Sequence, residues 1–154
     1  MHETQVLIIG AGVGGLTASL ALQKLGFNVK IYEQATELVE VGAGLTISPN
    51  ATRALEFCGL GPFMADHADT PSAGALVHYR TGAALHKTQR DGSFKERFGA
   101  EYYQIHRADL HDALAAAVRA NDQHAIILDH TFERLEQTEE TVTAHFTNGN
   151  TAGG

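Results

Sequence analysis

Three glycines near the N-terminus have the spacing of a diphosphate-binding turn. Gly10, Gly12 and Gly15 form the pattern G-x-G-x-x-G within the stretch VLIIGAGVGG. In such a turn the first glycine permits a tight bend, the second lets the main chain approach a diphosphate, and the third lets a helix pack closely on a strand. The N–H groups at the start of that helix then face negatively charged oxygens. The pattern therefore predicts binding of a dinucleotide.

An acidic residue at a second position indicates which dinucleotide is bound. Glu33 follows a second apolar stretch, 18 residues after Gly15, where a carboxylate can accept hydrogen bonds from both hydroxyls of an adenosine ribose. Its negative charge would repel a 2′-phosphate, which disfavours NADP and leaves FAD or NAD. Purely structural glycines and a solvated strand-end glutamate are the alternative interpretations.

The elements around these residues are predicted from hydrophobic periodicity. Residues 5–9 are typical of a buried strand, residues 13–25 of a helix that stops at Gly26, and residues 27–32 of a second strand. A strand, helix and strand in this order predict a parallel pair with a right-handed crossover.

Further elements follow along the chain. The pattern predicts, in chain order, a connection over 34–47, a helix over 49–58, an irregular or weakly helical segment over 60–72, a small inserted sheet from strands 75–80, 83–88 and 102–106, a helix over 109–120, a third strand of the main sheet over 125–128, and a hairpin from 132–138 and 141–147. The predicted fold class is α/β, a Rossmann-like βαβ domain with a parallel sheet, a small inserted β-sheet and a β-hairpin.

The late return to the main sheet favours FAD over NAD. A compact dehydrogenase domain is expected to return to its sheet soon after the second strand, whereas here residues 34–106 intervene. This favours a flavin-binding architecture. Half of an NAD-dependent dehydrogenase is the less favoured alternative.

Composition excludes several classes of partner. The 154 residues are 44% hydrophobic with a net charge of −7, and the basic residues are dispersed, so we expect no nucleic acid and no membrane as partner. A cytoplasmic location is expected. Among the nine histidines, His106 and His111 lie five residues apart, which does not fit an H-x-x-x-H pair, so no metal site is predicted.

Three stretches carry a family resemblance. They are VLIIGAGVGGLTASLAL at 6–22 with the Glu-Gln pair at 33–34, VGAGLTISPNATRAL at 41–55, and GAEYYQIHRADLHDAL at 99–114. Together they resemble the FAD-dependent aromatic hydroxylases, which include salicylate, 3-hydroxybenzoate and 6-hydroxynicotinate hydroxylases. The resemblance covers nearly the whole chain.

The resemblance implies FAD as the cofactor and a set of residues that bind it. The glycines would line the pyrophosphate, Glu33 would bind the adenosine ribose, Arg107 would reach the phosphate and ribityl side, the segment 42–47 would run beside the flavin, and the backbone at Phe132 would contact adenine. The complete set is Gly10, Gly12, Val13, Gly14, Gly15, Glu33, Gln34, Leu45, Thr46, Arg107 and Phe132. No catalytic residue is implied.

The resemblance also implies an activity for the complete enzyme. Relatives use NAD(P)H and O₂ to hydroxylate an aromatic substrate. In this chain the later Asp-Gly and Gly-Asp motifs of the family are absent, the strand after Asn148-Gly149 is expected to be missing, and the ending Thr-Ala-Gly-Gly is typical of a cut or an engineered linker. We therefore expect residues 1–154 to be a truncated FAD-binding domain without its substrate domain. A stand-alone, non-catalytic dinucleotide-binding module is the alternative.

Overall fold

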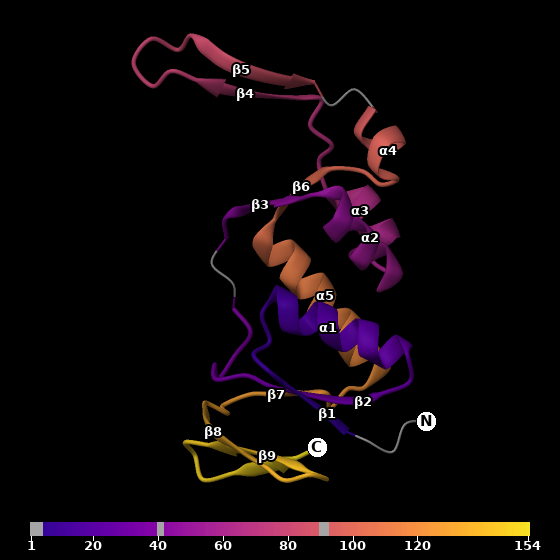
Figure 1. The fold of residues 1–154 in the computed structure, drawn as a ribbon, viewed down its shortest axis with the longest axis vertical. Helices are drawn as coiled ribbons and strands as arrows, with labels where there is room; N and C mark the ends of the chain where they lie inside the picture. The colour runs from indigo at the N-terminus through magenta and orange to yellow at the C-terminus, as the bar shows by residue number, and fades with distance from the viewer. Residues whose placement is uncertain (1–4, 40–41, 90–92) are drawn as a thin grey trace. The chain divides into compact units, whose positions relative to one another are not determined.

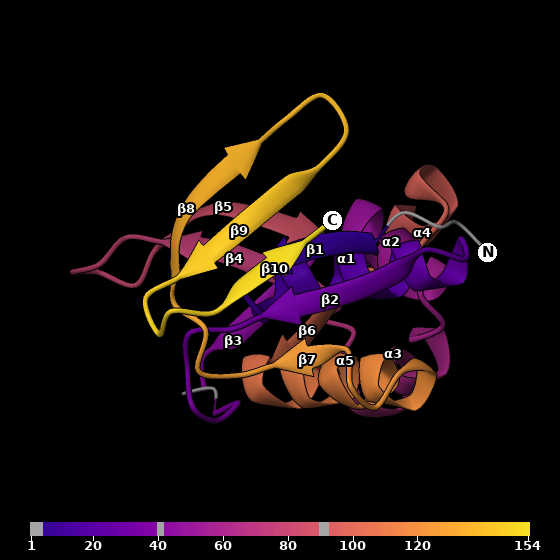
Figure 2. The same cartoon turned by 90° about the horizontal axis from the view of Figure 1, so that it is seen from below.

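The computed structural model describes residues 5–39, 42–89 and 93–154. The chain divides into two compact units, the first formed by Met1–Gly42 with Arg107–Gly154 and the second by Ala43–His106. Figure 1 labels the elements of both units along the chain except β10, which is labelled in Figure 2. No helix in the described residues is long and apolar enough to cross a membrane.

The first unit is built on a three-stranded parallel sheet. Its strands, with β2 in the middle, are β1 (Gln5–Ile9), β2 (Asn28–Tyr32) and β7 (Ile126–Ile127). β1 and β2 are paired along their whole length, and helix α1 (Val13–Lys24) connects them. A parallel pair needs such a crossover because the chain must return to the starting edge of the sheet. The predicted strand, helix and strand, and the predicted third strand, are confirmed.

Helices α1 and α5 (Arg107–Asn121) pack together on one face of this sheet (Figures 1 and 2). The buried side chains of the two helices are mostly apolar and comprise Leu16, Ser19, Leu20, Leu110, His111, Leu114, Ala115 and Val118. Burial of each leucine contributes roughly 1.5–3 kcal/mol. This packing fixes the N-terminus of α1 relative to α5.

An antiparallel sheet covers the opposite face (Figure 2). Its strands, in the spatial order β10-β9-β8, are β8 (Phe132–Gln137), β9 (Val142–Phe146) and β10 (Thr151–Gly153). A buried cluster of Tyr32, Ala144, Phe146 and Ala152 joins the two sheets. The rings of Tyr32 and Phe146 stack with their centroids 4.8 Å apart, and burial raises the pKa of the Tyr32 phenol. The predicted hairpin is confirmed as β8 and β9.

The end of the chain corrects one prediction. The strand expected to be missing after Asn148-Gly149 is present as β10, which pairs with β9. Gly149 has a φ of +85°, a left-handed conformation that suits a tight turn. The Gln5 side chain donates a hydrogen bond of 3.0 Å to the Gly153 carbonyl. The strand is only three residues long, and two of its three residues, Ala152 and Gly153, are of types depleted in strands.

The described part of the second unit contains two antiparallel strand pairs and three short helices. In chain order its elements are β3 (Gly44–Ile47), α2 (Pro49–Phe57), α3 (Gly61–His67), β4 (Ala73–Val77), β5 (Ala84–Gln89), α4 (Ser93–Phe98) and β6 (Tyr103–His106). The Thr52 hydroxyl donates to the Glu101 carbonyl over 2.9 Å and connects α2 to the segment before β6.

Strand pairing in the second unit differs from the prediction. The strands at 75–80, 83–88 and 102–106 were expected to form one sheet, but β4 pairs with β5 while β6 pairs with β3. β3 lies in the segment 34–47, which was predicted to be a connection. The segment predicted as irregular or weakly helical at 60–72 contains α3, and α4 was not predicted. A four-residue strand that itself begins with a glycine, Gly44, gives almost no periodic signal, so its distant partner could not be identified.

Candidate functional site

The glycine turn connects β1 to α1 at the carboxyl edge of the parallel sheet. Gly10 has a φ of +97°, which glycine adopts without steric cost, and its N–H donates to the Tyr32 carbonyl over 2.8 Å. Gly12 is the N-cap residue, so α1 begins at Val13. The carboxyl ends of β1 and β2 therefore meet the N-terminus of α1 at one edge, which is where open α/β sheets bind ligands.

Gly15 is required by the packing of α1 on β1. A Cβ at this position would lie 2.0 Å from the Gly10 carbonyl oxygen and 3.3 Å from Cγ2 of Ile8. The first distance is far inside van der Waals contact, and the obstructing atom belongs to the main chain, so it cannot rotate away. Any larger residue would push the helix off the turn.

Gly12 and Gly14 face open space instead. A Cβ at either position would meet no described atom within 4 Å, and no described side chain forms a cap hydrogen bond at the N-terminus of α1. The first N–H groups of a helix have no acceptor within the helix, and its dipole adds about 0.3–1 kcal/mol of attraction for an exposed anion. The turn thus has both the room and the donors for a diphosphate.

Both polar main-chain groups of Ala11, in the middle of the turn, are held by side chains from elsewhere. Its N–H donates to Oε2 of Glu33 over 2.7 Å, and its carbonyl accepts a hydrogen bond from Nε2 of His111 over 2.7 Å. Ala11 is 1% exposed and His111 is 2% exposed. A carbonyl can only accept, so Nε2 of His111 carries the proton.

Glu33 lies directly after β2 and has a second main-chain partner. Its Oε1 accepts a hydrogen bond from the Ala35 N–H over 2.9 Å, and its own N–H donates to the Ile127 carbonyl over 2.9 Å. A carboxylate offers about four lone-pair positions, so acceptor capacity remains for sugar hydroxyls. The half-buried Glu33 is therefore held firmly at the sheet edge beside the glycine turn.

Arg107 is the first residue of α5 and is half-buried. It precedes His111 by four residues, so both lie on the same face of the helix. His111 contacts Ala11, which means that this face of α5 is turned toward the glycine turn. The structure thus places Arg107 on the same side of the first unit as the glycines and Glu33.

Three other predicted residues also belong to the first unit. Val13 is the first residue of α1 and is half-buried, whereas Gln34 is exposed directly after Glu33. Phe132 is the first residue of β8, is 40% exposed and pairs with Phe146. The segment before Phe132 lies beside β2, because the His130 N–H donates to the Glu33 carbonyl over 2.9 Å.

Leu45 and Thr46 belong to the second unit. Both lie on β3, where Leu45 is opposite Ile105 and Thr46 is opposite Gln104. Leu45 is half-buried and Thr46 is exposed. The segment 42–47, expected to be a loop, is thus largely a strand, and the part of these two residues in a flavin site stays a prediction.

The sequence did not reveal what His111 does. The sequence predicts no metal site at His111 and gives it no other role, whereas its Nε2 contacts a carbonyl 100 residues away. One signal was available, since His111 lies beside Leu110 and one turn from Leu114 on a helix whose apolar face is buried. A histidine on such a face needs a hydrogen-bond partner.

The chain matches a family model for an FAD binding domain over residues 3–153. Among curated proteins, it is 35% identical over 151 residues to 3-amino-4-hydroxybenzoate 2-monooxygenase of Streptomyces cremeus, an alignment that covers 98% of this chain and 38% of that protein. It is 34% identical over 148 residues to 3-hydroxybenzoate 6-hydroxylase of Polaromonas naphthalenivorans, which covers 96% of this chain and 37% of that protein. The chain therefore spans less than two-fifths of the length of these relatives.

The fold is also similar to that of a solved structure that contains FAD. The fold is similar to that of Klebsiella pneumoniae HpxO complexed with FAD and uric acid, with a TM-score of 0.83, 26% identity, and coverage of 98% of this chain and 37% of that one. The predicted family and the predicted α/β class are confirmed. The relatives that the chain matches are aromatic-ring monooxygenases, and the chain itself belongs to the FAD binding domain family, so the cofactor of this domain is FAD.

Proposed function

We propose that this chain holds the diphosphate of FAD on the glycine turn between β1 and α1. The observation that carries the proposal is the open first turn of α1, where a Cβ at Gly12 or Gly14 would meet no described atom within 4 Å. Main-chain N–H groups at this turn can donate to the diphosphate oxygens, and such charge-assisted hydrogen bonds are roughly twice as strong as neutral ones.

The other predicted residues have separate roles in the proposed site. Glu33, with Gln34 beside it, binds the adenosine ribose, and the main chain at Phe132 contacts adenine. Arg107 binds on the phosphate and ribityl side, because its planar, permanently charged guanidinium can bind two oxygens at once. For Leu45 and Thr46, the family resemblance implies a role beside the flavin.

When bound, FAD supplies the redox chemistry, and the protein supplies binding and orientation. For the complete protein we propose hydroxylation of an aromatic ring with NAD(P)H and O₂. The names of three relatives refer to 3-amino-4-hydroxybenzoate, 3-hydroxybenzoate and 6-hydroxynicotinate. All three compounds are aromatic rings with a hydroxyl and a carboxylate, so we propose a hydroxylated aromatic acid as the substrate class.

Equilibrium binding tests the cofactor site. The purified chain is titrated with FAD, NAD and NADP, and binding is followed by calorimetry and, for FAD, by flavin fluorescence. FAD is expected to bind most tightly and NADP most weakly, because the Glu33 carboxylate repels a 2′-phosphate. Tighter binding of NAD than of FAD would favour a dehydrogenase half, and no binding of FAD would overturn the proposal.

A turnover assay distinguishes a monooxygenase from a non-catalytic FAD-binding module. NADH and NADPH oxidation is measured with this chain, and with the longer protein where the gene encodes one, in the presence of 3-hydroxybenzoate or 6-hydroxynicotinate. Substrate-stimulated oxidation with a hydroxylated product supports the monooxygenase. FAD binding with neither substrate-stimulated oxidation nor a hydroxylated product would identify a non-catalytic FAD-binding module.

A further inference from the structure

The main chain of Ala11 is fixed between two side chains that come from distant parts of the first unit. Glu33 accepts its N–H and His111 donates to its carbonyl, each over 2.7 Å. The flanking residues are Gly10 and Gly12, which have no side chains and can adopt many backbone conformations. The Glu33 contact therefore orients the Gly10–Ala11 peptide, and the His111 contact orients the Ala11–Gly12 peptide.

Fixing the Ala11 carbonyl also fixes the N–H of Gly12. The peptide group is planar and trans, so the C=O of one residue and the N–H of the next point in opposite directions. With the Ala11 carbonyl directed at His111 on α5, the Gly12 N–H is directed away from α5. Gly12 is also the N-cap residue of α1, and a Cβ on it would meet no described atom within 4 Å.

His111 is well suited to hold this carbonyl. It is 2% exposed, so water does not compete for the hydrogen bond. Its neighbours on α5, Leu110 and Leu114, are fully buried and anchor the helix. The imidazole donor is therefore presented to the turn by a rigid element.

We propose that His111 is a positioning residue for the cofactor, because it orients the Ala11–Gly12 peptide so that the Gly12 N–H faces the diphosphate. The proposal rests on the proposed function, namely that the glycine turn holds FAD. It assigns His111 a role beyond packing, since a histidine that only filled the space between α5 and the turn could be replaced by a ring of similar shape without loss of affinity.

Three variants separate orientation from packing. His111→Phe keeps an aromatic ring but removes the donor, His111→Gln places an amide N–H near the position of Nε2, and His111→Asn keeps an amide that is too short to reach the carbonyl. Val118→Ala is the matched control, because Val118 is a fully buried residue of α5 two turns farther from the glycine turn. For each protein the FAD Kd, the thermal midpoint and the ¹H–¹⁵N resonance of Gly12 are measured, with the Kd taken at a temperature where the protein is folded.

We expect His111→Phe and His111→Asn to raise the FAD Kd about tenfold, the equivalent of one lost hydrogen bond, and to shift the Gly12 amide resonance. His111→Gln should stay within about threefold of the wild-type Kd, and Val118→Ala should lower the thermal midpoint without changing the Kd. If His111→Phe does not fold, the FAD Kd and the Gly12 resonance of His111→Gln are compared with those of His111→Asn, and a higher Kd in the Asn variant supports the proposal.

An unchanged Kd and Gly12 resonance in the Phe or Asn variant would overturn the role of His111 while leaving the cofactor site intact. Wild-type protein that binds no FAD would overturn the proposed function and this inference with it. In that case the Gly12 resonance still shows whether His111 orients the peptide.

Discussion

The Glu33 carboxylate accepts a hydrogen bond from the Ala11 N–H over 2.7 Å, although 22 residues separate them. Its other oxygen accepts the N–H of Ala35 over 2.9 Å. The acid proposed to bind the ribose thus also fastens the end of β2 to the turn that follows β1. The same side chain contributes to the fold and to the proposed site.

Replacement of Glu33 by alanine is expected to affect both stability and binding. The Ala11 N–H, in a residue that is 1% exposed, would lose its acceptor, and an unsatisfied buried donor costs about 1–3 kcal/mol. Chemical denaturation should show a loss of this size in the free energy of unfolding. FAD titration should show a Kd raised about tenfold by the lost ribose contacts. An unchanged free energy of unfolding would contradict the structural role of the carboxylate.

Gly12→Val is expected to separate folding from binding. The φ of −70° at Gly12 suits any residue, and the added side chain would meet no described atom within 4 Å, so the free energy of unfolding should fall only by about 1 kcal/mol, because valine is a poorer N-cap residue than glycine. The side chain would occupy the path of the diphosphate, and loss of at least two charge-assisted hydrogen bonds should weaken FAD binding about 100-fold or more. Wild-type affinity in this variant would show that the diphosphate does not approach Gly12.

Gly15→Ala is expected to lower the stability of the fold. Its Cβ would lie 2.0 Å from the Gly10 carbonyl oxygen, so the main chain must move, and overpacking of this kind typically costs about 1–3 kcal/mol. Gly14→Ala is the matched control for stability, because its Cβ meets no described atom and alanine favours a helix by about 0.8–1 kcal/mol. Urea denaturation of both variants measures the difference. Equal stability of the two would mean that α1 does not pack closely on β1.

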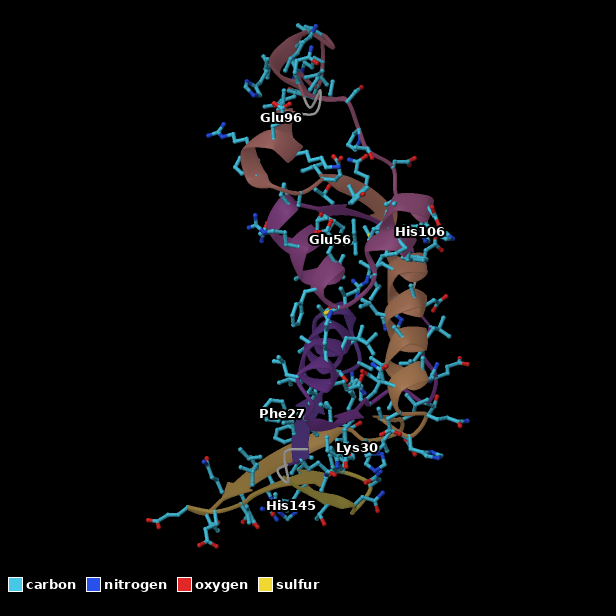
Figure 3. All side chains as sticks on the ribbon, turned by 90° about the vertical axis from the view of Figure 1, so that its right-hand side faces the viewer. Phe27, Lys30, Glu56, Glu96, His106 and His145 are labelled. Carbon is cyan, nitrogen blue, oxygen red and sulfur yellow. The ribbon has the colours of Figure 1, made fainter. Side chains whose placement is uncertain are left out.

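The ion pair between Lys30 and Asp122 predicts a pH dependence. Nζ of Lys30 (Figure 3) donates to Oδ2 of Asp122 over 2.8 Å, and the His124 N–H donates to Oδ1 over 2.8 Å. The Lys30 hydrogen bond, followed by that from His124, lowers the pKa of Asp122. A lowered pKa in the folded state gives stability above the unfolded pKa of about 3.9, and this stability is lost as the pH falls through the folded value.

The comparison of wild type with Asp122→Asn measures this contribution. Solvent reaches the pair, so the variant should be less stable by no more than about 1 kcal/mol at pH 7. The difference should vanish at pH values below the folded pKa of Asp122. Denaturation curves at a series of pH values test this, and a constant difference at all of them would contradict the assignment.

Much of the first unit could be predicted because its signals are local. β1 is a short apolar run, β2 alternates apolar and polar residues, and Gly10 and Gly26 follow β1 and α1 closely. β10 could not be predicted because it is only three residues long, and the pairing of β3 with β6 could not be predicted because it joins two four-residue strands that are far apart in the sequence. Short strands take their conformation from their partners rather than from their own sequence.

In the candidate site, too, the local features could be predicted from the sequence and the long-range contact could not. The glycines and Glu33 are adjacent in the fold because one strand, helix and strand unit brings them together, and the fixed spacing of that unit is visible in the sequence. The contact of His111 with Ala11 spans 100 residues and depends on how α5 packs against α1. Helix packing of this kind leaves no motif, only a histidine on an apolar face.

A crystal structure of this protein with FAD bound tests the central claim most directly. The account predicts diphosphate oxygens within hydrogen-bond distance of the main-chain N–H groups at residues 12–14, with the adenosine ribose hydroxyls on the Glu33 carboxylate. A structure in which the glycine turn contacts no part of the cofactor, and FAD is bound elsewhere on the chain, would contradict it.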